Sequence, residues 1–254
     1  MKILFLGDIV GSRGCRFAAS VVPQIKKENG IDAVIVNGEN SADGNGMTPA
    51  SLAMLSFADV ITSGNHAFRR KEVYKLLDSA YCNVLRPANY PKGAPGRGVF
   101  ILDRGKYRLA VVNLMGTVYM DSLDNPFEVI ENILEDIDTP NIFVDFHAEA
   151  TSEKKAMGFF LDGRVTAVAG THTHVQTADE TVLPKGTGYI TDAGMCGAEN
   201  SVLGVRTDII IEKLRTRLPM KFTESEESPF LNGVIIDFNE KIGKTNKINR
   251  LQVR

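Results

Sequence analysis

Hydrophobic and polar positions alternate in blocks along the first third of the chain. Lys2–Val10 is almost continuously apolar, which is typical of a buried strand, and the amphipathic stretch after it predicts a helix that ends at Gly30. A second buried strand follows at Ala33–Asn40, a second helix at Thr48–Ala58 and a third strand at Asp59–His66. This order of elements predicts parallel βαβ units.

The rest of the chain adds antiparallel strands to this pattern. Residues 99–105 and 107–116 predict a hairpin, and residues 230–253 alternate like two antiparallel strands around a turn. Further helices are expected at 71–80, 125–137 and 152–161, and further strands at 141–148 and 165–174. Together these elements predict an α/β sandwich of mixed sheets with helices on its outer faces. We expect a single domain over residues 1–254, because no linker, repeat or low-complexity tract divides the chain.

The composition is ordinary for a soluble globular protein, with 43% hydrophobic and 24% charged residues. The formal net charge is −2 and the pI is near 6.1, so the chain has no excess of basic residues. The longest cationic run is Arg69–Lys71, which is too short to form a basic stripe. Stable binding to nucleic acid is therefore not expected, whereas small phosphorylated ligands stay open.

Cysteine usage and the amino terminus predict a cytoplasmic protein. Cys15, Cys82 and Cys196 are odd in number and lack CxxC spacing, which is typical of inert thiols in a reducing compartment. The apolar run before Asp8 is too short for a signal peptide or a membrane span, and we expect no membrane association. The sequence leaves the oligomeric state open, and a homo-oligomer is compatible with it.

The ends of the predicted strands carry an unusual set of polar residues. Five apolar runs end in carboxylate, amide or imidazole side chains, namely Asp8, Glu39 with Asn40, Asn65 with His66, His147, and His172 with His174. All four histidines of the chain belong to this set, although strand ends occupy little of the sequence. Because open sheets bind ligands at the carboxyl ends of their strands, we expect these side chains to meet in one site.

The chemistry of this set favours a divalent metal centre. Carboxylates, amides and imidazoles without thiolates are typical ligands of manganese, iron or zinc. The set exceeds the four ligands of one tetrahedral zinc, which favours two ions that share a carboxylate. Gly7, Gly38, Gly64 and Gly170 stand one or two positions before the polar residues, where a missing side chain lets the backbone enter a crowded centre. Each member also has a structural explanation of its own, such as a helix N-cap for Asp8, but a metal centre explains all of them together.

The order of these motifs resembles a known family. A "GD", a carboxylate, a "GNH", a lone histidine and "GTHTH" are similar to the calcineurin-like metallophosphoesterases. More narrowly, "FLGDIVGSRG", "VNGEN", "TSGNH", "VDFHAEATSEKKA", "GTHTHVQTAD" and "YITDAGMCG" resemble the YmdB-type branch, in order from residue 1 to about residue 205. The chain departs from the broad superfamily where Val10 replaces the histidine of D-x-H and Glu39 replaces the usual aspartate. The resemblance implies a four-layer α/β-β/α sandwich and a dinuclear metal site.

The resemblance also implies a division of the ligands between two ions. One ion takes Asp8, Glu39, Asn40 and His174, and the other takes Glu39, Asn65, His147 and His172. Iron or manganese is expected, with zinc and magnesium as alternatives. On an extended segment, residues two apart share a face, so His172 and His174 are both expected to point to the centre and Thr173 away from it.

The activity implied by the resemblance is hydrolysis of small phosphodiesters, with 2′,3′- or 3′,5′-cyclic nucleotides as the leading substrates. A hydroxide held between the metals would attack phosphorus in line, and His66 would protonate the leaving oxygen. One alternative is a metal-bound regulatory or nucleotide-sensing module with little turnover. A metal-dependent amidohydrolase is disfavoured by the order of the motifs. Arg13 is either a phosphate contact or a solvated residue, and residues 194–200 are expected to form a flexible loop near the mouth of the site.

Overall fold

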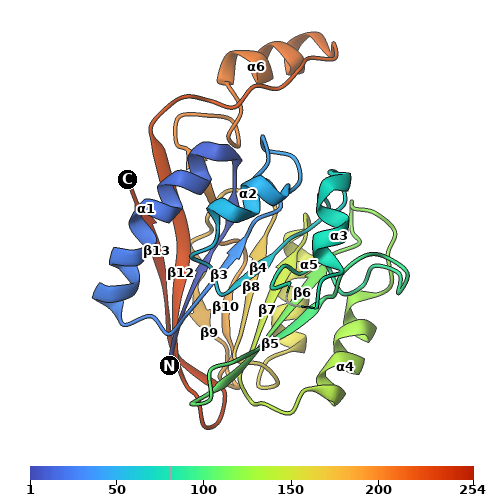
Figure 1. Ribbon diagram of the computed structural model, residues 1–254. Helices are drawn as coiled ribbons and strands as arrows, with labels where there is room; N and C mark the ends of the chain where they lie inside the picture. The colour runs from blue at the N-terminus through green and yellow to red at the C-terminus, as the bar shows by residue number, and fades with distance from the viewer. Residues whose placement is uncertain (81) are drawn as a thin grey trace.

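Two facing β-sheets form the body of the molecule. The computed structural model describes residues 1–80 and 82–254, and all statements below refer to them (Figure 1). The first sheet has seven strands, in the order β2 (Asp8–Ile9), β11 (Met195–Ala198), β12 (Pro229–Asn239), β1 (Lys2–Leu6), β3 (Ala33–Asn37) and β4 (Val60–Thr62), with β13 (Lys244–Val253) beside β12. The second has six, in the order β5 (Val99–Asp103), β6 (Arg108–Met115), β7 (Ile142–His147), β8 (Ala167–Thr171), β10 (Gly188–Ile190) and β9 (Thr181–Val182). Both sheets mix parallel and antiparallel pairs, as predicted.

Helices cover the outer face of each sheet. They are α1 (Gly11–Asn29), α2 (Pro49–Met54), a 3-10 turn η1 (Lys71–Val73) with α3 (Tyr74–Leu77), α4 (Pro126–Asp136) and α5 (Thr151–Phe160), whereas α6 (Thr207–Thr216) stands away from the sheets. The first sheet packs against α1 and α2, and the second packs against α4 and α5. The four-layer α/β-β/α sandwich is therefore confirmed. None of the described helices is both long and apolar enough to cross a membrane.

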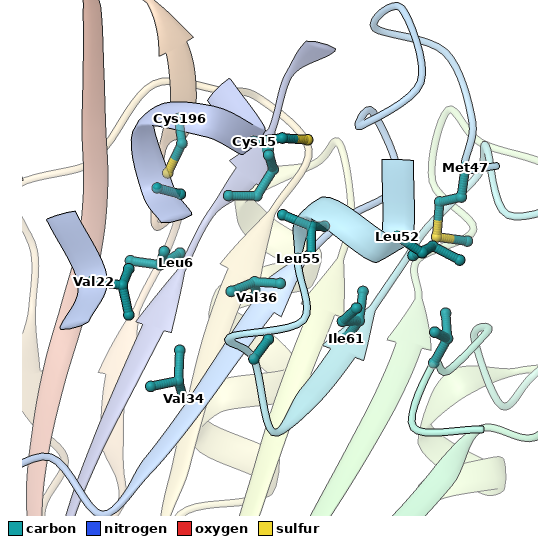
Figure 2. Packing of buried hydrophobic residues seen from close by; sticks show 14 of the residues in the cluster. Leu6, Cys15, Val22, Val34, Val36, Met47, Leu52, Leu55, Ile61 and Cys196 are labelled. Carbon is teal, nitrogen blue, oxygen red and sulfur yellow. The ribbon is translucent and has the colours of Figure 1, made fainter. Parts of the chain in front are cut away.

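The core explains why the first strand is apolar on both faces. Ile3 and Phe5 point into the layer between the two sheets, where the rings of Phe5 and Phe143 lie 4.8 Å apart. Leu4 and Leu6 point the other way, into the layer beneath the helices, and Figure 2 shows Leu6 in that layer. A strand covered on both faces has no solvated side, so it reads as a continuous apolar run.

Local sequence signals predicted the ends of several helices and strands correctly. Gly30 adopts φ 64° directly after α1, as expected of a glycine that ends a helix. Thr48 caps α2 through the backbone N–H of Ser51, whose hydroxyl accepts from the Thr48 backbone. The hairpin of β5 and β6 and the final pair of β12 and β13 are antiparallel, as predicted.

Other expectations were wrong. Residues 194–200 are not a flexible loop, since β11 is a buried strand that pairs with both β2 and β12. The expected helix over 71–80 is reduced to η1 and the single turn of α3. The expected strand over 165–174 ends at Thr171, before both histidines of the HxH motif. These segments depend on partners that are distant in the chain, so local periodicity does not define them.

Candidate metal centre

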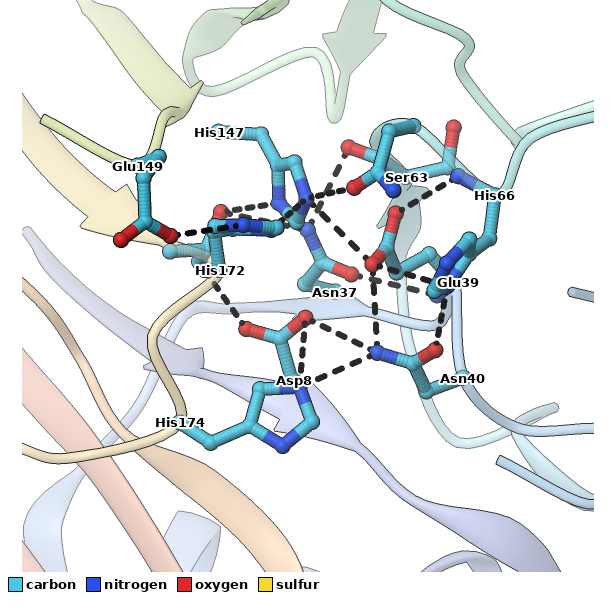
Figure 3. A network of polar contacts seen from close by, with 12 residues as sticks. Asp8, Asn37, Glu39, Asn40, Ser63, His66, His147, Glu149, His172 and His174 are labelled. Carbon is cyan, nitrogen blue, oxygen red and sulfur yellow. Dashed lines mark hydrogen bonds and ion pairs between the residues drawn. The ribbon is translucent and has the colours of Figure 1, made fainter. Parts of the chain in front are cut away.

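All eight predicted site residues converge at one edge of the two sheets. Asp8 follows β1, Glu39 and Asn40 follow β3, Asn65 and His66 follow β4, His147 ends β7, and His172 and His174 follow β8. Figure 3 shows these side chains, apart from Asn65, pointing toward one another from both sheets, and Asn65 joins them through His147. The predicted convergence at the carboxyl ends of the strands is therefore observed.

The first group of donors surrounds His147. Its Nε2 lies 2.9 Å from Asn65 Oδ1, 3.1 Å from His172 Nδ1 and 3.3 Å from Glu39 Oε1. Ligand atoms of Glu39, His147 and His172 all lie within 4.8 Å of one another. His147 and Glu39 are buried completely or almost so, which removes water as an alternative partner.

Outer contacts of the two imidazoles turn a lone pair of each ring toward this point. The Thr171 hydroxyl donates to Asp145 Oδ1 at 2.7 Å, so the Thr171 oxygen accepts from His147 Nδ1 at 2.9 Å. In the neutral ring, His147 Nε2 is then the nitrogen with the free lone pair. His172 Nε2 lies 3.0 Å from Glu149 Oε2 and donates to it, which leaves the lone pair on His172 Nδ1. The two ring nitrogens that face each other beside the Glu39 carboxylate must share a cation, which is a proton in the metal-free centre and which a metal ion can replace, so the residues fit a metal ion.

The second group of donors surrounds Asp8. The Asn40 amide nitrogen lies 3.3 Å from Asp8 Oδ1 and 3.2 Å from His174 Nε2, and His174 Nε2 lies 3.7 Å from Asp8 Oδ1. His174 Nδ1 is buried and has no hydrogen-bond partner within the described residues. A half turn of the Asn40 carboxamide exchanges its oxygen and nitrogen, which brings an acceptor toward Asp8 and His174. With that turn, the second group also offers a metal ion only acceptor atoms.

Protons balance the buried carboxylates of the centre when no metal ion is bound. Burial raises the pKa of Asp8, although His174 and His147 partly oppose this. Burial also opposes ionisation of Glu39, but the neighbouring His147 lowers the Glu39 pKa to about 2. Burial opposes protonation of His147, yet Glu39 and Asp8 raise its pKa to about 9. His147 therefore carries a proton in the metal-free centre, and a metal ion bound at Nε2 would displace it.

His172 and His174 reach the centre through a turn rather than an extended strand. The backbone φ angles are 104° at His172 and 66° at His174, in the left-handed region. The prediction that alternation along a strand aims both rings was therefore wrong. Thr173 is turned away as expected, because its N–H and its hydroxyl donate to Asp192 Oδ2 at 3.0 Å and 2.8 Å.

His66 lies at the rim of the centre. Its Nδ1 is 2.8 Å from Asn40 Oδ1 and 3.4 Å from Glu39 Oε1, and its side chain is 25% exposed. Burial lowers the pKa of His66 from its ordinary value, and the charge on Glu39 partly opposes this. Because Nδ1 is engaged, Nε2 is the nitrogen left for an incoming molecule.

Sequence reasoning missed the residues that hold the predicted ligands in place. Asp145, Glu149, Thr171 and Asp192 make the contacts described above. Asp145, Glu149 and Asp192 belong to the quoted motifs "VDFHAEATSEKKA" and "YITDAGMCG", from which only His147 was taken as a site residue. For Asp145 and Glu149 the signal was a carboxylate two positions from His147, whereas Asp192 stands far from every predicted ligand in the chain and gave no such signal.

Comparison with known proteins decides the family. The model of the YmdB-like protein family matches residues 4–251. The chain belongs to this family. The YmdB-like chain is 45% identical to a Bacillus subtilis protein named 2′,3′-cyclic-nucleotide 2′-phosphodiesterase, over 100% of this chain and 97% of the relative.

Solved structures support the same assignment. The YmdB-like chain is 33% identical to a crystal structure described as a novel phosphatase of Mycoplasma pneumoniae, with a TM-score of 0.93 over 100% of this chain and 93% of that one. A calcineurin-like phosphoesterase, YfkN from Bacillus subtilis, shares the fold at 11% identity, with a TM-score of 0.53 over 99% of this chain and 90% of that one. The predicted resemblance to calcineurin-like phosphoesterases and to their YmdB-type branch is confirmed.

Proposed function

We propose that this chain is a metal-dependent phosphodiesterase whose substrates are small phosphodiesters, 2′,3′-cyclic nucleotides first among them and 3′,5′-cyclic nucleotides second. The observation that carries the proposal is the cluster of Glu39, His147 and His172, whose ligand atoms lie within 4.8 Å of one another. Such a donor set binds divalent metals. The substrate class rests on the name of the Bacillus subtilis relative, which is similar over 97% of its length.

The ligands divide into the two groups that surround His147 and Asp8. Asn65, His147 and His172 would hold one ion, Asp8, Asn40 and His174 would hold the other, and Glu39 lies within reach of both groups. When bound, the two ions supply a water of lowered pKa and positive charge for the phosphate oxygens. Iron or manganese suits this set of oxygen and nitrogen donors without thiolates, and zinc and magnesium are the alternatives.

His66 is the proposed proton donor to the leaving oxygen. Glu39 Oε1, 3.4 Å from Nδ1, favours the protonated ring, and the negative charge of a bound phosphodiester adds to this effect. Glu39 Oε1 faces Nδ1–H of the protonated ring, so Nε2–H is presented to the substrate. Burial lowers the pKa of His66, which makes the charged ring a readier acid.

Hydrolysis with and without metal tests this proposal. The purified protein is stripped with EDTA, reloaded with Mn²⁺ or Fe²⁺, and assayed on bis-p-nitrophenyl phosphate and on adenosine 2′,3′-cyclic phosphate. We expect turnover only after reloading, together with retention of about two ions per chain in metal analysis. Hydrolysis that EDTA does not alter, by a protein that retains no metal, would overturn the proposal.

The His66→Ala variant separates an enzyme from a metal-bound regulatory module. A proton donor matters only for turnover, so the variant is expected to lose about 10²- to 10⁴-fold in kcat while it retains its metal. If metal-loaded wild-type protein leaves a broad panel of phosphodiesters intact but still binds nucleotides, the regulatory function is favoured instead.

A further inference from the structure

A cavity of about 960 Å³ opens beside His66 and is not used by the metal ligands. Its walls come from segments that are distant in the chain, namely Asp43–Asn45, Arg69 with Arg70, Leu203–Val205 and Met220–Glu224. The last two segments flank α6, which projects from the sandwich (Figure 1). None of the residues of α6 is buried. The volume lies within the range of about 300–1,000 Å³ that is typical of small-molecule sites.

The cavity combines an apolar wall with a polar one of mixed charge, in which Arg70 pairs with Asp43. Leu203, Met220 and Phe222 line it with side chains that are 47%, 37% and 48% exposed. Lys213 Nζ stands 4.3 Å from the centroid of the Phe222 ring and holds that ring in place. Among the described residues, no hydrogen-bond or ion-pair partner engages the guanidinium of Arg69. Exposed apolar and aromatic surface beside a free cation suits a ligand with a flat ring and a negative charge.

The apolar wall is anchored to the body of the protein. Val205 pairs with Glu224, which closes the base of the α6 segment. The Glu224 carboxylate accepts the Arg13 backbone N–H at 3.1 Å, at the start of α1. Gly204 packs so closely on Val10 that an added Cβ would lie 2.4 Å from a Val10 methyl. The wall is therefore formed before any ligand arrives.

His66 connects this cavity to the metal centre. It contacts Glu39 and Asn40 on one side and lines the cavity on the other. A residue that protonates the leaving oxygen must lie next to the leaving group, so whatever is attached to that oxygen extends into the space that His66 faces. In a cyclic nucleotide, that oxygen belongs to the ribose, which carries the base.

We propose that the cavity binds the nucleoside part of the substrate, with the base stacked against Phe222 and flanked by Leu203 and Met220. This inference rests on the proposed function and extends it to the source of substrate preference. Every nucleobase offers a flat face to an aromatic ring. The cavity therefore selects nucleotides over smaller phosphodiesters, and it does not select one base over another. Arg69 lies beside His66, where it faces the negative charge of the phosphate.

Two cyclic phosphodiesters that differ only beyond the reacting ring test the inference. Adenosine 2′,3′-cyclic phosphate carries a base, whereas glycerol 1,2-cyclic phosphate has a similar five-membered phosphodiester without one. We expect the metal-loaded protein to prefer the nucleotide, and Phe222→Ala to lower the ratio of the two kcat/KM values about 5- to 150-fold. Phe222→Tyr should restore the ratio, because it keeps the stacking face.

A binding measurement without metal provides a second readout. Titration calorimetry measures the affinity of EDTA-treated protein for adenosine 3′-monophosphate. We expect this affinity to be lower in Phe222→Ala than in the wild type, by a similar factor. The matched control is Leu214→Ala, since Leu214 lies on the same α6 segment, is 60% exposed and does not line the cavity. Thermal melts of the variants establish that each is folded.

The outcomes separate this inference from the proposed function. If the metal-loaded protein hydrolyses neither cyclic phosphate, the proposed function fails. If it hydrolyses both and Phe222→Ala leaves the ratio and the binding unchanged, only the cavity assignment is overturned. Phe222→Ala could instead leave the ratio of kcat/KM values unchanged and convert a dimer into a monomer, as measured by the molar mass in solution. The apolar wall would then contact a second copy of the chain, and the assignment is again overturned.

Discussion

The ammonium group of Lys154 lies 2.7 Å from Asp192 Oδ2, and both side chains are almost completely buried. The same carboxylate oxygen accepts the N–H and the hydroxyl of Thr173, between the two histidines of the HxH turn. Asp192 Oδ1 accepts the Gly194 N–H at 2.9 Å. This ion pair therefore ties α5 to the turn whose backbone is held in the left-handed region.

Lys154→Met tests the importance of that pair. Removal of one partner leaves Asp192 as an uncompensated buried charge, so we expect the free energy of unfolding to fall by about 3–5 kcal/mol. Urea unfolding measures this change, and metal analysis of the folded variant reports how well the turn still presents its histidines. Lys155→Met is the matched control, because the neighbouring Lys155 is 50% exposed and should change the stability by at most about 1 kcal/mol. Equal effects of the two substitutions would contradict this role.

Glu149→Ala tests whether the outer contact of His172 sets its lone pair. Without the carboxylate 3.0 Å from Nε2, the ring can carry its proton on either nitrogen, and we expect affinity for Mn²⁺ to fall about 10- to 100-fold. Glu149→Gln should retain most of the affinity, since its amide oxygen still accepts from Nε2–H. Titration calorimetry on stripped protein gives the affinities, with exposed Glu135→Ala as the control. A Gln variant as weak as the Ala variant would show that the charge, not the tautomer, matters.

Gly64→Ala tests how tightly the centre is packed. An added Cβ would lie 2.2 Å from His147 Cδ2 and 2.4 Å from Glu39 Oε2, so both ligands must shift. Overpacking of this kind costs about 1–3 kcal/mol of stability, and we expect the variant to fold but to lose metal. Gly93→Ala is the control, because nothing lies within 4 Å of its added Cβ. Normal metal content in Gly64→Ala would contradict the close approach.

The buried thiols predict a loss of stability at alkaline pH. Burial raises the pKa of Cys15 from 9.0 to about 12, with the charge of Glu224 as a smaller cause. Between these two values the folded protein keeps a proton that the unfolded chain has released, so the free energy of unfolding falls as the pH rises. The slope per thiol is about 1.4 kcal/mol per pH unit. Cys15→Ala should flatten the change measured by urea unfolding between pH 9 and 11, and an unaltered slope would refute this assignment.

Much of the fold was predictable because its signals are local. The apolar run of β1 and the glycine at position 30 mark element types and ends within a few residues. The strand β11 and the helix α6 were not predicted from the sequence. β11 is defined by its pairing with β12, which a segment of four residues does not reveal by periodicity. The helix α6 has an amphipathic pattern, but none of its residues is buried against the core.

The sequence by itself determined which residues meet at the candidate site, because polar residues at the carboxyl ends of parallel strands must lie at one edge of a sheet. Only the tertiary structure decided how they face one another. The tautomers of His147 and His172 depend on Thr171 and Glu149, and the HxH turn depends on Asp192, through contacts that join separate elements. The base-binding cavity depends on two segments that flank α6, more than 130 positions after His66. Hydrogen-bond direction and cavity shape arise from such distant pairs, so spacing along the chain could not reveal them.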